Sequence, residues 1–348
     1  MSSHDPTKAR PDAGAREAAG TRAASCAAAR TADAPGTPTT GAPVSGAFAS
    51  GTCAPRPRFT FAWGSYRLEL GERTALMGIV NVTADSFADG GRFLDPKLAA
   101  DHCLRLADDG ADILDVGGES TRPGALEVPA DEERRRVLPV IEAAAARVDV
   151  PISIDTSKPE VARAALDAGA AMINDVTAGA DPALLALAAE RGVPVVLMHM
   201  KGTPRTMQRD AHYADVVAEI AEFLGARCRA AIAAGVAREH VIVDPGIGFG
   251  KTVEHNFEII ARLPELQRLG RPLLVGPSRK SFIGRTLGLD VGERLIGTAA
   301  AVAACVLGGA HIVRVHDVGE MRQVCEIADA VRRADAVRRA GGVGDGDA

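Results

Sequence analysis

The sequence lacks the features by which several classes of protein are recognised. It has no excess of basic residues: the formal net charge is -5 and the pI is about 5.9, which argues against nucleic acid or an acidic membrane surface as a partner. No apolar run approaches the ~20 residues of a membrane span, and the N-terminus lacks the apolar core of a secretory signal. We therefore expect a cytoplasmic protein with no membrane partner and no nucleic-acid partner.

Cysteine is scarce, and its spacing fits neither a metal site nor a disulfide framework. The chain has no CxxC pair and no pair of histidines near a cysteine. Its six cysteines are at positions 26, 53, 103, 228, 305 and 325. Zinc sites and small disulfide-rich domains need closely spaced cysteines. We interpret these residues as reduced, mostly buried thiols.

Large apolar side chains are almost absent from residues 1–58, which consist mainly of Ala, Thr, Gly, Pro, Ser and Arg. Such a segment cannot bury enough surface to offset the entropy of ordering it, so we predict a disordered extension. Residues 59–335 carry the pattern of one folded domain with a large core. The glycine- and aspartate-rich residues 336–348 are predicted to form a flexible C-terminal tail.

Short apolar runs that end in polar residues recur along the folded domain. Before them, residues 59–70 alternate around a Gly-Ser pair, which predicts a β-hairpin that closes one end of the fold. The apolar runs are 77–80, 113–116, 152–154, 172–173, 195–198, 241–243, 273–275 and 312–313. Helical patterns between and after them cover 96–109, 131–147, 158–168, 182–191, 213–234, 253–263, 292–307 and 318–333.

Eight strands alternating with eight helices favour an α/β fold of the (β/α)8 TIM-barrel type, which typically needs ~250 residues. A doubly wound open sheet is the structural alternative. That sheet would concentrate polar groups at one switch point, whereas here polar residues end every strand. We therefore predict the barrel, with its chemistry at the carboxyl ends of the strands.

Asp244 is the most informative of these polar residues, because it ends a wholly apolar strand. A carboxylate is costly to bury unless it accepts hydrogen bonds, for example from the paired N–H groups of a ligand. The stretch 244–251 that follows alternates glycines and ends in lysine. It does not match the phosphate loop of nucleotide hydrolases, so it is either another anion-binding loop or an ordinary glycine-rich turn.

Two further stretches combine cations with strand ends. Arg314 and His316 are two residues apart and share one face of a strand, which would make a clamp for an oxyanion unless a carboxylate neutralises the arginine. Lys280 and Ser281 stand where a strand passes into a helix, and the N–H groups at such a helix start suit a carboxylate. A surface helix cap with solvated bases is the alternative.

Asn81, Asp155 and Asn174 also end strands, where isolated Asn and Asp residues commonly form turns. Their coincidence at one end of a barrel favours a functional reading. His199 lies in an apolar stretch and is more simply interpreted as a hydrogen-bonded core residue than as a catalyst.

Together these motifs resemble the dihydropteroate synthase family. The stretches that carry the resemblance are 77–87, 115–124, 155–159, 173–175, 197–200, 244–251, 278–281 and 314–317, in the order and spacing of the family, over roughly residues 59–333. Two departures are Ala84, where the family usually has proline, and Ile247, where it usually has phenylalanine. They affect the expected loop stiffness and pocket shape and remove no polar group.

The resemblance implies a transferase of folate synthesis, active as a homodimer. It would join 6-hydroxymethyl-7,8-dihydropterin pyrophosphate to 4-aminobenzoate and release pyrophosphate, with Mg2+ as cofactor. The same barrel also occurs in pterin-binding methyltransferases, and a non-catalytic pterin-binding paralogue is a further alternative. A methyltransferase would not need the stretches 278–281 and 314–317, and a non-catalytic paralogue would be expected to have lost polar positions.

The resemblance also implies roles for individual residues, matched by motif position. The residues that act in catalysis would be Asp155, Asp244 and Lys280. The pterin would be held by Asp155, Asn174, Asp244 and Lys280, between walls formed by Met198, Phe249 and Gly276. The pyrophosphate would be held by Thr121, Arg314 and His316, with Asn81 on the metal. The aminobenzoate would be held by Ser281 and by the loops around Phe87 and Pro123.

Overall fold

The computed structural model describes residues 53, 56–83, 96–122, 124–203, 206–207 and 211–341. An antiparallel hairpin comes first and a parallel sheet follows it. The strands are β1 (Phe59–Trp63), β2 (Tyr66–Leu70), β3 (Ala75–Asn81), β4 (Ile113–Gly117), β5 (Ile152–Asp155), β6 (Met172–Asp175), β7 (Val195–Met198), β8 (Val241–Asp244), β9 (Leu274–Val275) and β10 (Ile312–Val315).

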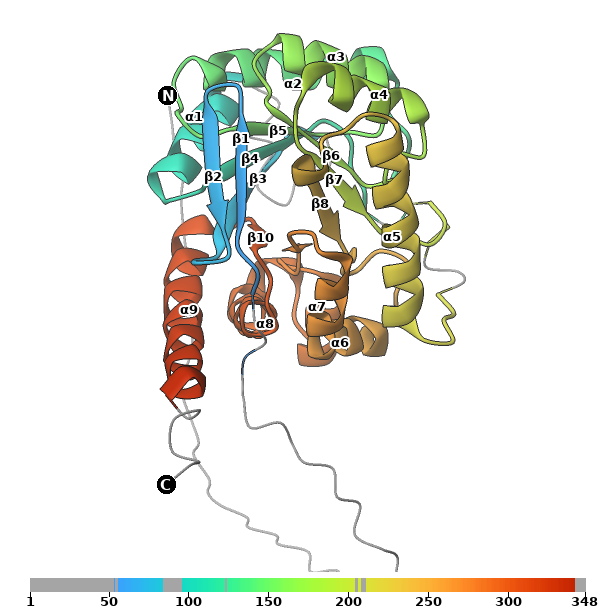
Figure 1. Cartoon of the computed structure of the whole chain (residues 1–348). Coiled ribbons are helices and arrows are strands. Elements are labelled where there is room, and N and C mark those ends of the chain that lie inside the picture. The colour runs from blue at the N-terminus through green and yellow to red at the C-terminus, as the bar shows by residue number, and fades with distance from the viewer. Residues whose placement is uncertain are drawn as a thin grey trace, which may run out of the picture. The chain divides into compact units, whose positions relative to one another are not determined.

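The parallel sheet is a closed barrel, as the sequence predicts (Figure 1). Its eight strands are hydrogen-bonded in the order β8-β7-β6-β5-β4-β3-β10-β9. Val243 of β8 pairs in parallel with Leu273, just before β9, and this pair closes the ring. In the register of the sheet, Asp155 lies beside Gly117 on one side and Asn174 on the other, so polar strand ends meet at one edge.

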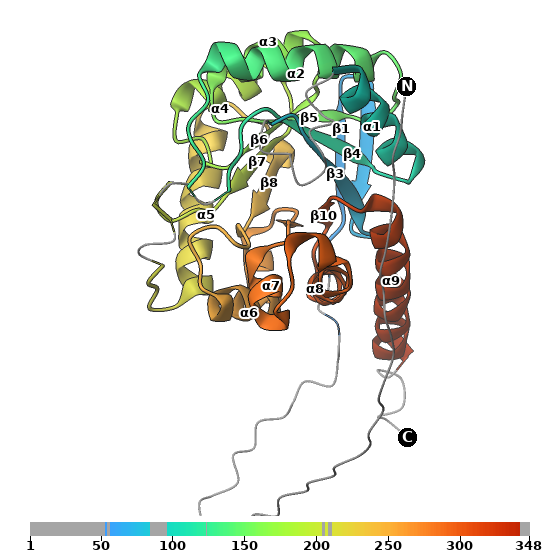
Figure 2. The same ribbon diagram turned by 180° about the vertical axis from the view of Figure 1, so that it is seen from behind.

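Helices surround the barrel, as the two opposite views show (Figure 1 and Figure 2). They are α1 (Pro96–Asp108), α2 (Ala130–Ala145), α3 (Pro159–Asp167), α4 (Pro182–Arg191), α5 (Val216–Ala233), α6 (Val253–Ala261), α7 (Ser281–Leu287), α8 (Leu295–Leu307) and α9 (Val318–Gly341), with 3-10 turns η3 (Arg238–His240), η4 (Leu263–Leu269) and η5 (Val291–Glu293). In α4 local sequence sets both ends: the Asp181 side chain accepts from Ala183 N at 2.9 Å, and Gly192 ends the helix with φ 62°.

Two helical regions differ from the prediction. The segment between β9 and β10 holds the short helix α7 as well as α8, because seven residues are too few for a clear helical period. Helix α9 continues to Gly341, beyond its predicted end at Arg333. Its last turns contain helix-favouring residues, and Asp335 pairs with Arg339 at 2.7 Å across one turn. Residues 342–348 of the predicted tail lie outside the described residues.

The hairpin closes the amino ends of the strands, away from their polar ends. Trp63 donates its indole N–H to the carbonyl of Ala171, just before β6, at 2.8 Å. The Phe61 ring stacks on His240, just before β8, with 6.3 Å between ring centroids. The predicted hairpin is confirmed, and its position leaves the carboxyl ends of the strands as the open end of the barrel.

The folded unit begins earlier than the predicted boundary at residue 58. Arg56 forms an ion pair with Asp329 of α9 at 2.8 Å, and the two side chains are 2% and 4% exposed. It also donates to Thr74 Oγ1 at 2.7 Å and to the carbonyl of Ala310 at 2.8 Å. The carbonyl of Cys53 accepts from Arg339. The composition of residues 53–58 resembles that of the extension, but Arg56 forms hydrogen bonds and an ion pair with residues on distant elements. Residues 1–52 lie outside the described residues.

The described cysteines are free and buried, as predicted for reduced thiols; they are Cys53, Cys103, Cys228, Cys305 and Cys325. Within the ranges that the structure describes, every helix is too short or too polar to cross a membrane.

Candidate active site

Side chains from four strands form one hydrogen-bonded network at the open end of the barrel. Arg314 donates from Nε to Asp115 Oδ2 at 2.6 Å and from Nη2 to Asp155 Oδ2 at 2.8 Å. Asn174 donates from Nδ2 to the same Asp115 oxygen at 2.9 Å. One guanidinium therefore holds two carboxylates, and three residues predicted from sequence, Asp155, Asn174 and Arg314, are brought together.

Burial dominates the electrostatics of this network. It raises the pKa of Asp155 to about 7, although Arg314 favours the ionised carboxylate, and the nearby Asp115 adds to the rise. Asp115 is 0% exposed, and its Oδ1 has no hydrogen-bond partner among the residues that the structure describes. A buried carboxylate oxygen is costly to leave unpaired, so this oxygen is available to a ligand or to water.

Asp244 is the last residue of β8 and is 6% exposed. Its Oδ1 accepts from the N–H of Gly246 at 2.7 Å. Burial raises the pKa of Asp244 to about 6, while the Gly246 N–H and the nearby Lys280 oppose the rise. Because one oxygen is engaged by the loop, the remaining acceptor capacity of this carboxylate can serve a ligand.

Lys280 precedes α7 and extends over the ring of Phe249, with Nζ 3.9 Å from the ring centroid. Burial lowers the pKa of this lysine to about 8, and the nearby Arg314 lowers it further. Ser281, the next residue, is exposed. The two side chains therefore diverge, as expected for adjacent residues at a helix start.

Apolar side chains from the ends of β6 and β7 and from the loop after β8 form a wall of the site. Met198 and Phe249 pack with Val176 and Met207 in a small buried cluster, separate from the main core. Gly276 follows β9, and a Cβ built on it would lie 3.8 Å from that of Arg314. The three residues predicted as walls thus lie near the charged network, at the end of β7, in the loop after β8 and directly after β9.

His316 differs from the prediction that it supplies a second cation. Its Nδ1 lies 2.9 Å from Ser278 Oγ, and its backbone N–H donates to the same oxygen at 3.2 Å. Burial lowers the pKa of His316 to about 3, helped by the nearby Arg279 and Arg314. In the protein without ligand the imidazole is therefore neutral at pH 7 and acts as a hydrogen-bonding group. Arg279 itself is engaged by Asp317, from Nε to Oδ2 at 3.1 Å.

Thr121 lines a cavity of about 430 Å³ beside Asp155. In the lining of the same cavity, Lys158 is bonded to Glu119 and lies 2.6 Å from Oε2 of Glu133, which is 0% exposed. This cluster joins the loop after β4, which carries Thr121, to the start of α3. The predicted aminobenzoate loops cannot be located in the same way, because Phe87 and Pro123 lie outside the described residues.

His199 is buried, and its Nδ1 lies 3.1 Å from the ammonium nitrogen of Lys251. Burial and this lysine lower the pKa of His199 to about 3. A neutral, hydrogen-bonded histidine agrees with the core interpretation made from sequence.

The sequence reasoning did not select Asp115, Ser278 or Lys251. Asp115 was detectable, because it is a carboxylate inside a short apolar run.

Mg2+ prefers hard oxygen ligands and commonly combines one or two protein oxygens with phosphate and water. Asn81 ends β3, half-buried, at the same edge as the network, and offers an amide oxygen. Among the described residues there is no group of three His, Cys, Asp or Glu side chains able to hold a metal alone. A magnesium ion beside Asn81 would therefore need oxygens from a phosphate ligand and from water to complete its coordination.

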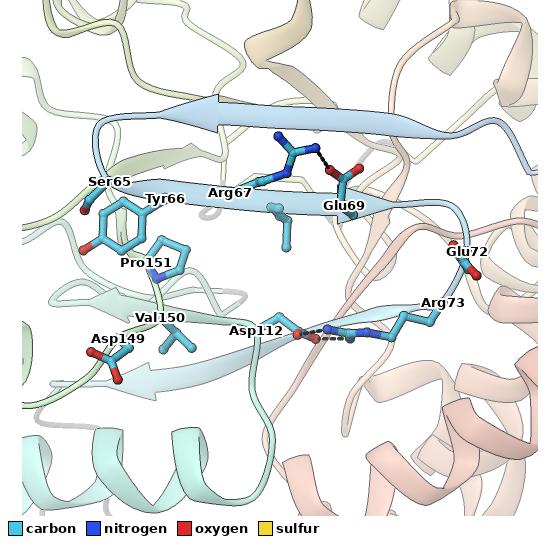
Figure 3. Close-up of a pocket in the computed structure, with 11 residues that line it drawn as sticks. Ser65, Tyr66, Arg67, Glu69, Glu72, Arg73, Asp112, Asp149, Val150 and Pro151 are labelled. Atoms are coloured by element: carbon cyan, nitrogen blue, oxygen red, sulfur yellow. Dashed lines mark hydrogen bonds and ion pairs between the residues drawn. The ribbon is translucent and has the colours of Figure 1, made fainter.

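A second hollow, of about 580 Å³, lies between the hairpin and the segments that precede β4 and β5. Four of its charged side chains are paired with one another: Arg67 with Glu69 at 2.5 Å and Arg73 with Asp112 at 2.5 Å (Figure 3). It lies at the closed end of the barrel, so it is not part of the candidate site.

Comparisons with known proteins agree with this geometry. The family model described as "Pterin binding enzyme" matches residues 77–316. A dihydropteroate synthase of Synechocystis sp. is 49% identical over 272 residues, which are 78% of this chain and 94% of that protein.

Solved structures agree as well. Yersinia pestis dihydropteroate synthase in a sulfonamide drug complex superimposes with a TM-score of 0.77 at 43% identity, over 79% of this chain and 100% of that one. The Xanthomonas albilineans enzyme with 4-aminobenzoic acid gives 0.73 at 46% identity, over 80% and 98%. The shared barrel, the network at its open end and the identity along most of both chains lead to one conclusion: the chain belongs to the pterin binding enzyme family, among the dihydropteroate synthases.

Proposed function

We propose that the chain joins 6-hydroxymethyl-7,8-dihydropterin pyrophosphate to 4-aminobenzoate, and that the polar strand ends carry this reaction. The observation that supports it best is the guanidinium of Arg314 held between Asp115 and Asp155, near the buried carboxylate of Asp244 and the half-buried ammonium of Lys280. A flat, polar ring and a polyanion need such a combination of buried acceptors and fixed cations.

The pterin lies against Asp244 in this proposal. Its amidine-like N–H edge can donate two parallel hydrogen bonds to a carboxylate. Asn174 and Asp155 meet other edges of the ring, and Lys280 donates to an acceptor of the ring. Met198, Phe249 and Gly276 form the walls, which suits a planar heterocycle because the walls are apolar and the acceptors lie at its edge.

The pyrophosphate faces Arg314, His316 and Thr121. Arg314 uses Nε and Nη2 for the two carboxylates, and in this proposal Nη1 donates to the leaving group. The neutral imidazole of His316 donates a hydrogen bond and adds no charge. When bound beside Asn81, Mg2+ would supply the positive charge that stabilises the leaving pyrophosphate.

The aminobenzoate carboxylate meets Ser281, which is exposed at the open end. In the reaction the bond between the pterin methylene carbon and the pyrophosphate oxygen ionises, and both electrons leave with pyrophosphate. Asp155 stabilises the positive charge on the pterin. The aryl amine then attacks the methylene carbon and loses a proton, which gives 7,8-dihydropteroate.

We also propose that the enzyme is cytoplasmic, because its described cysteines are buried free thiols. We further propose that it forms a homodimer. Large apolar side chains are exposed on the α7–α8 side: Leu287 is 52% exposed and Ile296 is 78% exposed. A second copy that covers this face would remove it from water.

The decisive experiment measures pyrophosphate release by the purified full chain. Release should require 4-aminobenzoate, the pterin pyrophosphate and Mg2+ together, and dihydropteroate should form in equal amount. Pterin binding without release would favour the non-catalytic alternative. Methyl transfer to or from a pterin, with no response to 4-aminobenzoate, would favour the methyltransferase.

A further inference from the structure

A buried lysine lies beneath the loop that follows β8. Lys251 is 3% exposed. Its ammonium nitrogen lies 2.8 Å from the carbonyl oxygen of Phe249, 3.1 Å from Nδ1 of His199 and 3.4 Å from the carbonyl oxygen of His199. These three acceptors match the three donors of an ammonium group, which offsets part of the cost of burying the charge.

The same loop packs directly on the end of β7. His199 donates its backbone N–H to the carbonyl of Asp244 at 2.9 Å. Gly246 has φ +69°, and a Cβ at this position would lie 2.0 Å from the carbonyl oxygen of His199. Only glycine permits this approach. The loop and His199 therefore form one packed unit, and Lys251 is the side chain that bonds to both parts of it.

This unit determines where two groups of the site lie. Phe249, whose carbonyl Lys251 holds, presents its ring to Lys280 at 3.9 Å. Asp244, whose Oδ1 is bonded to Gly246, begins the loop. Burial lowers the pKa of Lys251 to about 7, so below this pH its ammonium charge favours the ionised form of Asp244. The position of the ring and the ionisation of the carboxylate thus both depend on Lys251.

We propose that Lys251 is a positioning residue of the pterin pocket: bonded to His199 and to the carbonyl of Phe249, it fixes the Phe249 ring and the loop that begins at Asp244. It acts through these residues and touches neither substrate. This inference rests on the proposed function, because it assigns Lys251 a role toward the pterin alone. It predicts that the pterin and the aminobenzoate respond differently to changes at this position.

The test compares Lys251→Met with Lys201→Met in the full chain. Lys201 is a matched control, since it is a neighbouring lysine whose Nζ lies 4.5 Å from the centroid of the Tyr213 ring, outside the proposed pocket. Calorimetry with the pterin pyrophosphate should show an affinity about tenfold lower for Lys251→Met, and the control should be unchanged. The KM for 4-aminobenzoate should stay within about twofold in both variants.

A pH series separates positioning from a general loss of structure. Among the groups described, the cations that face Asp244 are Lys251, Lys280 and Arg314. Lys251 in turn faces the charged groups Asp244 and Lys280 and the titratable imidazole of His199. Removing the charge of Lys251 leaves fewer cations to stabilise the Asp244 carboxylate. The fall in pterin affinity at acidic pH should therefore begin at a higher pH in Lys251→Met than in the wild type.

A second pair of variants covers the case in which Lys251→Met does not fold. His199→Leu removes the acceptor at Nδ1, whereas His199→Asn retains an acceptor oxygen near the same position. His199→Leu should weaken pterin binding, and His199→Asn should restore most of it. Equal losses for both substrates with an unchanged pH dependence, or equal affinity in the two His199 variants, would overturn the proposal. Absence of pyrophosphate release by the wild type would instead refute the proposed function, because pterin binding is measured without turnover.

Discussion

Replacing Asp244 by asparagine is expected to stabilise the ligand-free protein above about pH 6 while removing most of its affinity for the pterin. The folded-state pKa of Asp244 is raised to about 6 by burial, above the value of about 3.9 that aspartate has in an unfolded chain. For an acid with a raised pKa, the folded state is favoured at low pH. This contribution is lost as pH rises from about 4 to about 6, because the carboxylate must ionise inside the protein.

The size of the effect follows from the two pKa values. A difference of about two units corresponds to about 3 kcal/mol at pH 7.5 and to about 1 kcal/mol at pH 4.5. Asparagine keeps an oxygen that can accept from the Gly246 N–H, 2.7 Å from the present carboxylate oxygen. Its amide N–H₂ needs a partner, so the observed gain should be smaller, about 1–2 kcal/mol at the higher pH.

Thermal unfolding without ligand measures this gain. The melting temperature of Asp244→Asn should exceed that of the wild type by a few degrees at about pH 7.5, and the difference should shrink at about pH 4.5. Calorimetry with the pterin ligand should show a loss of about 2–4 kcal/mol in binding, because the amide presents a donor to the ligand's own N–H. A variant less stable than the wild type at pH 7.5 would show that attraction to Lys280 and Arg314 outweighs the burial of Asp244.

The remaining predictions concern the open end, the cluster around Lys158 and the N-terminal boundary. Ser281→Ala should raise the KM for 4-aminobenzoate by the equivalent of about 1–2 kcal/mol and leave pterin affinity unchanged; an equal loss for the pterin would contradict the separate placement of the two substrates. Lys158→Met leaves the carboxylate of Glu133 buried without a cation and should cost about 3–5 kcal/mol in urea unfolding. Arg56→Met removes the ion-pair partner of the buried Asp329 and should lower the melting temperature without changing kcat, whereas an unchanged melting temperature would mean that this ion pair adds no stability.

Much of the fold is predictable because its signals are local. A strand buried on both faces shows as a short apolar run, and a strand end at the open end of a barrel shows as a polar residue after that run. This reasoning places Asp155, Asn174 and Asp244 correctly at the open end. It fails for α7, whose seven residues carry no period.

Long-range partners are not visible in the sequence. Arg314 is bonded to Asp115 across 199 residues, and Arg56 to Asp329 across 273. Nothing local to Arg56 distinguishes it from the arginines of the extension. The neutral state of His316 has the same origin, because it depends on burial and on cations from other segments. Such properties arise only once the barrel has brought these segments together.

The hairpin has a consequence for optical measurements. The chain has a single tryptophan, Trp63. The hairpin holds it in the closed end of the barrel, where it is 7% exposed and its indole is hydrogen-bonded to the carbonyl of Ala171. Its fluorescence should shift to longer wavelength when the barrel unfolds and water reaches the indole. Ligands that enter at the opposite end should leave the emission unchanged, so intrinsic fluorescence reports folding and does not report binding. An emission change on adding the pterin would reveal a structural change transmitted along the whole length of the strands.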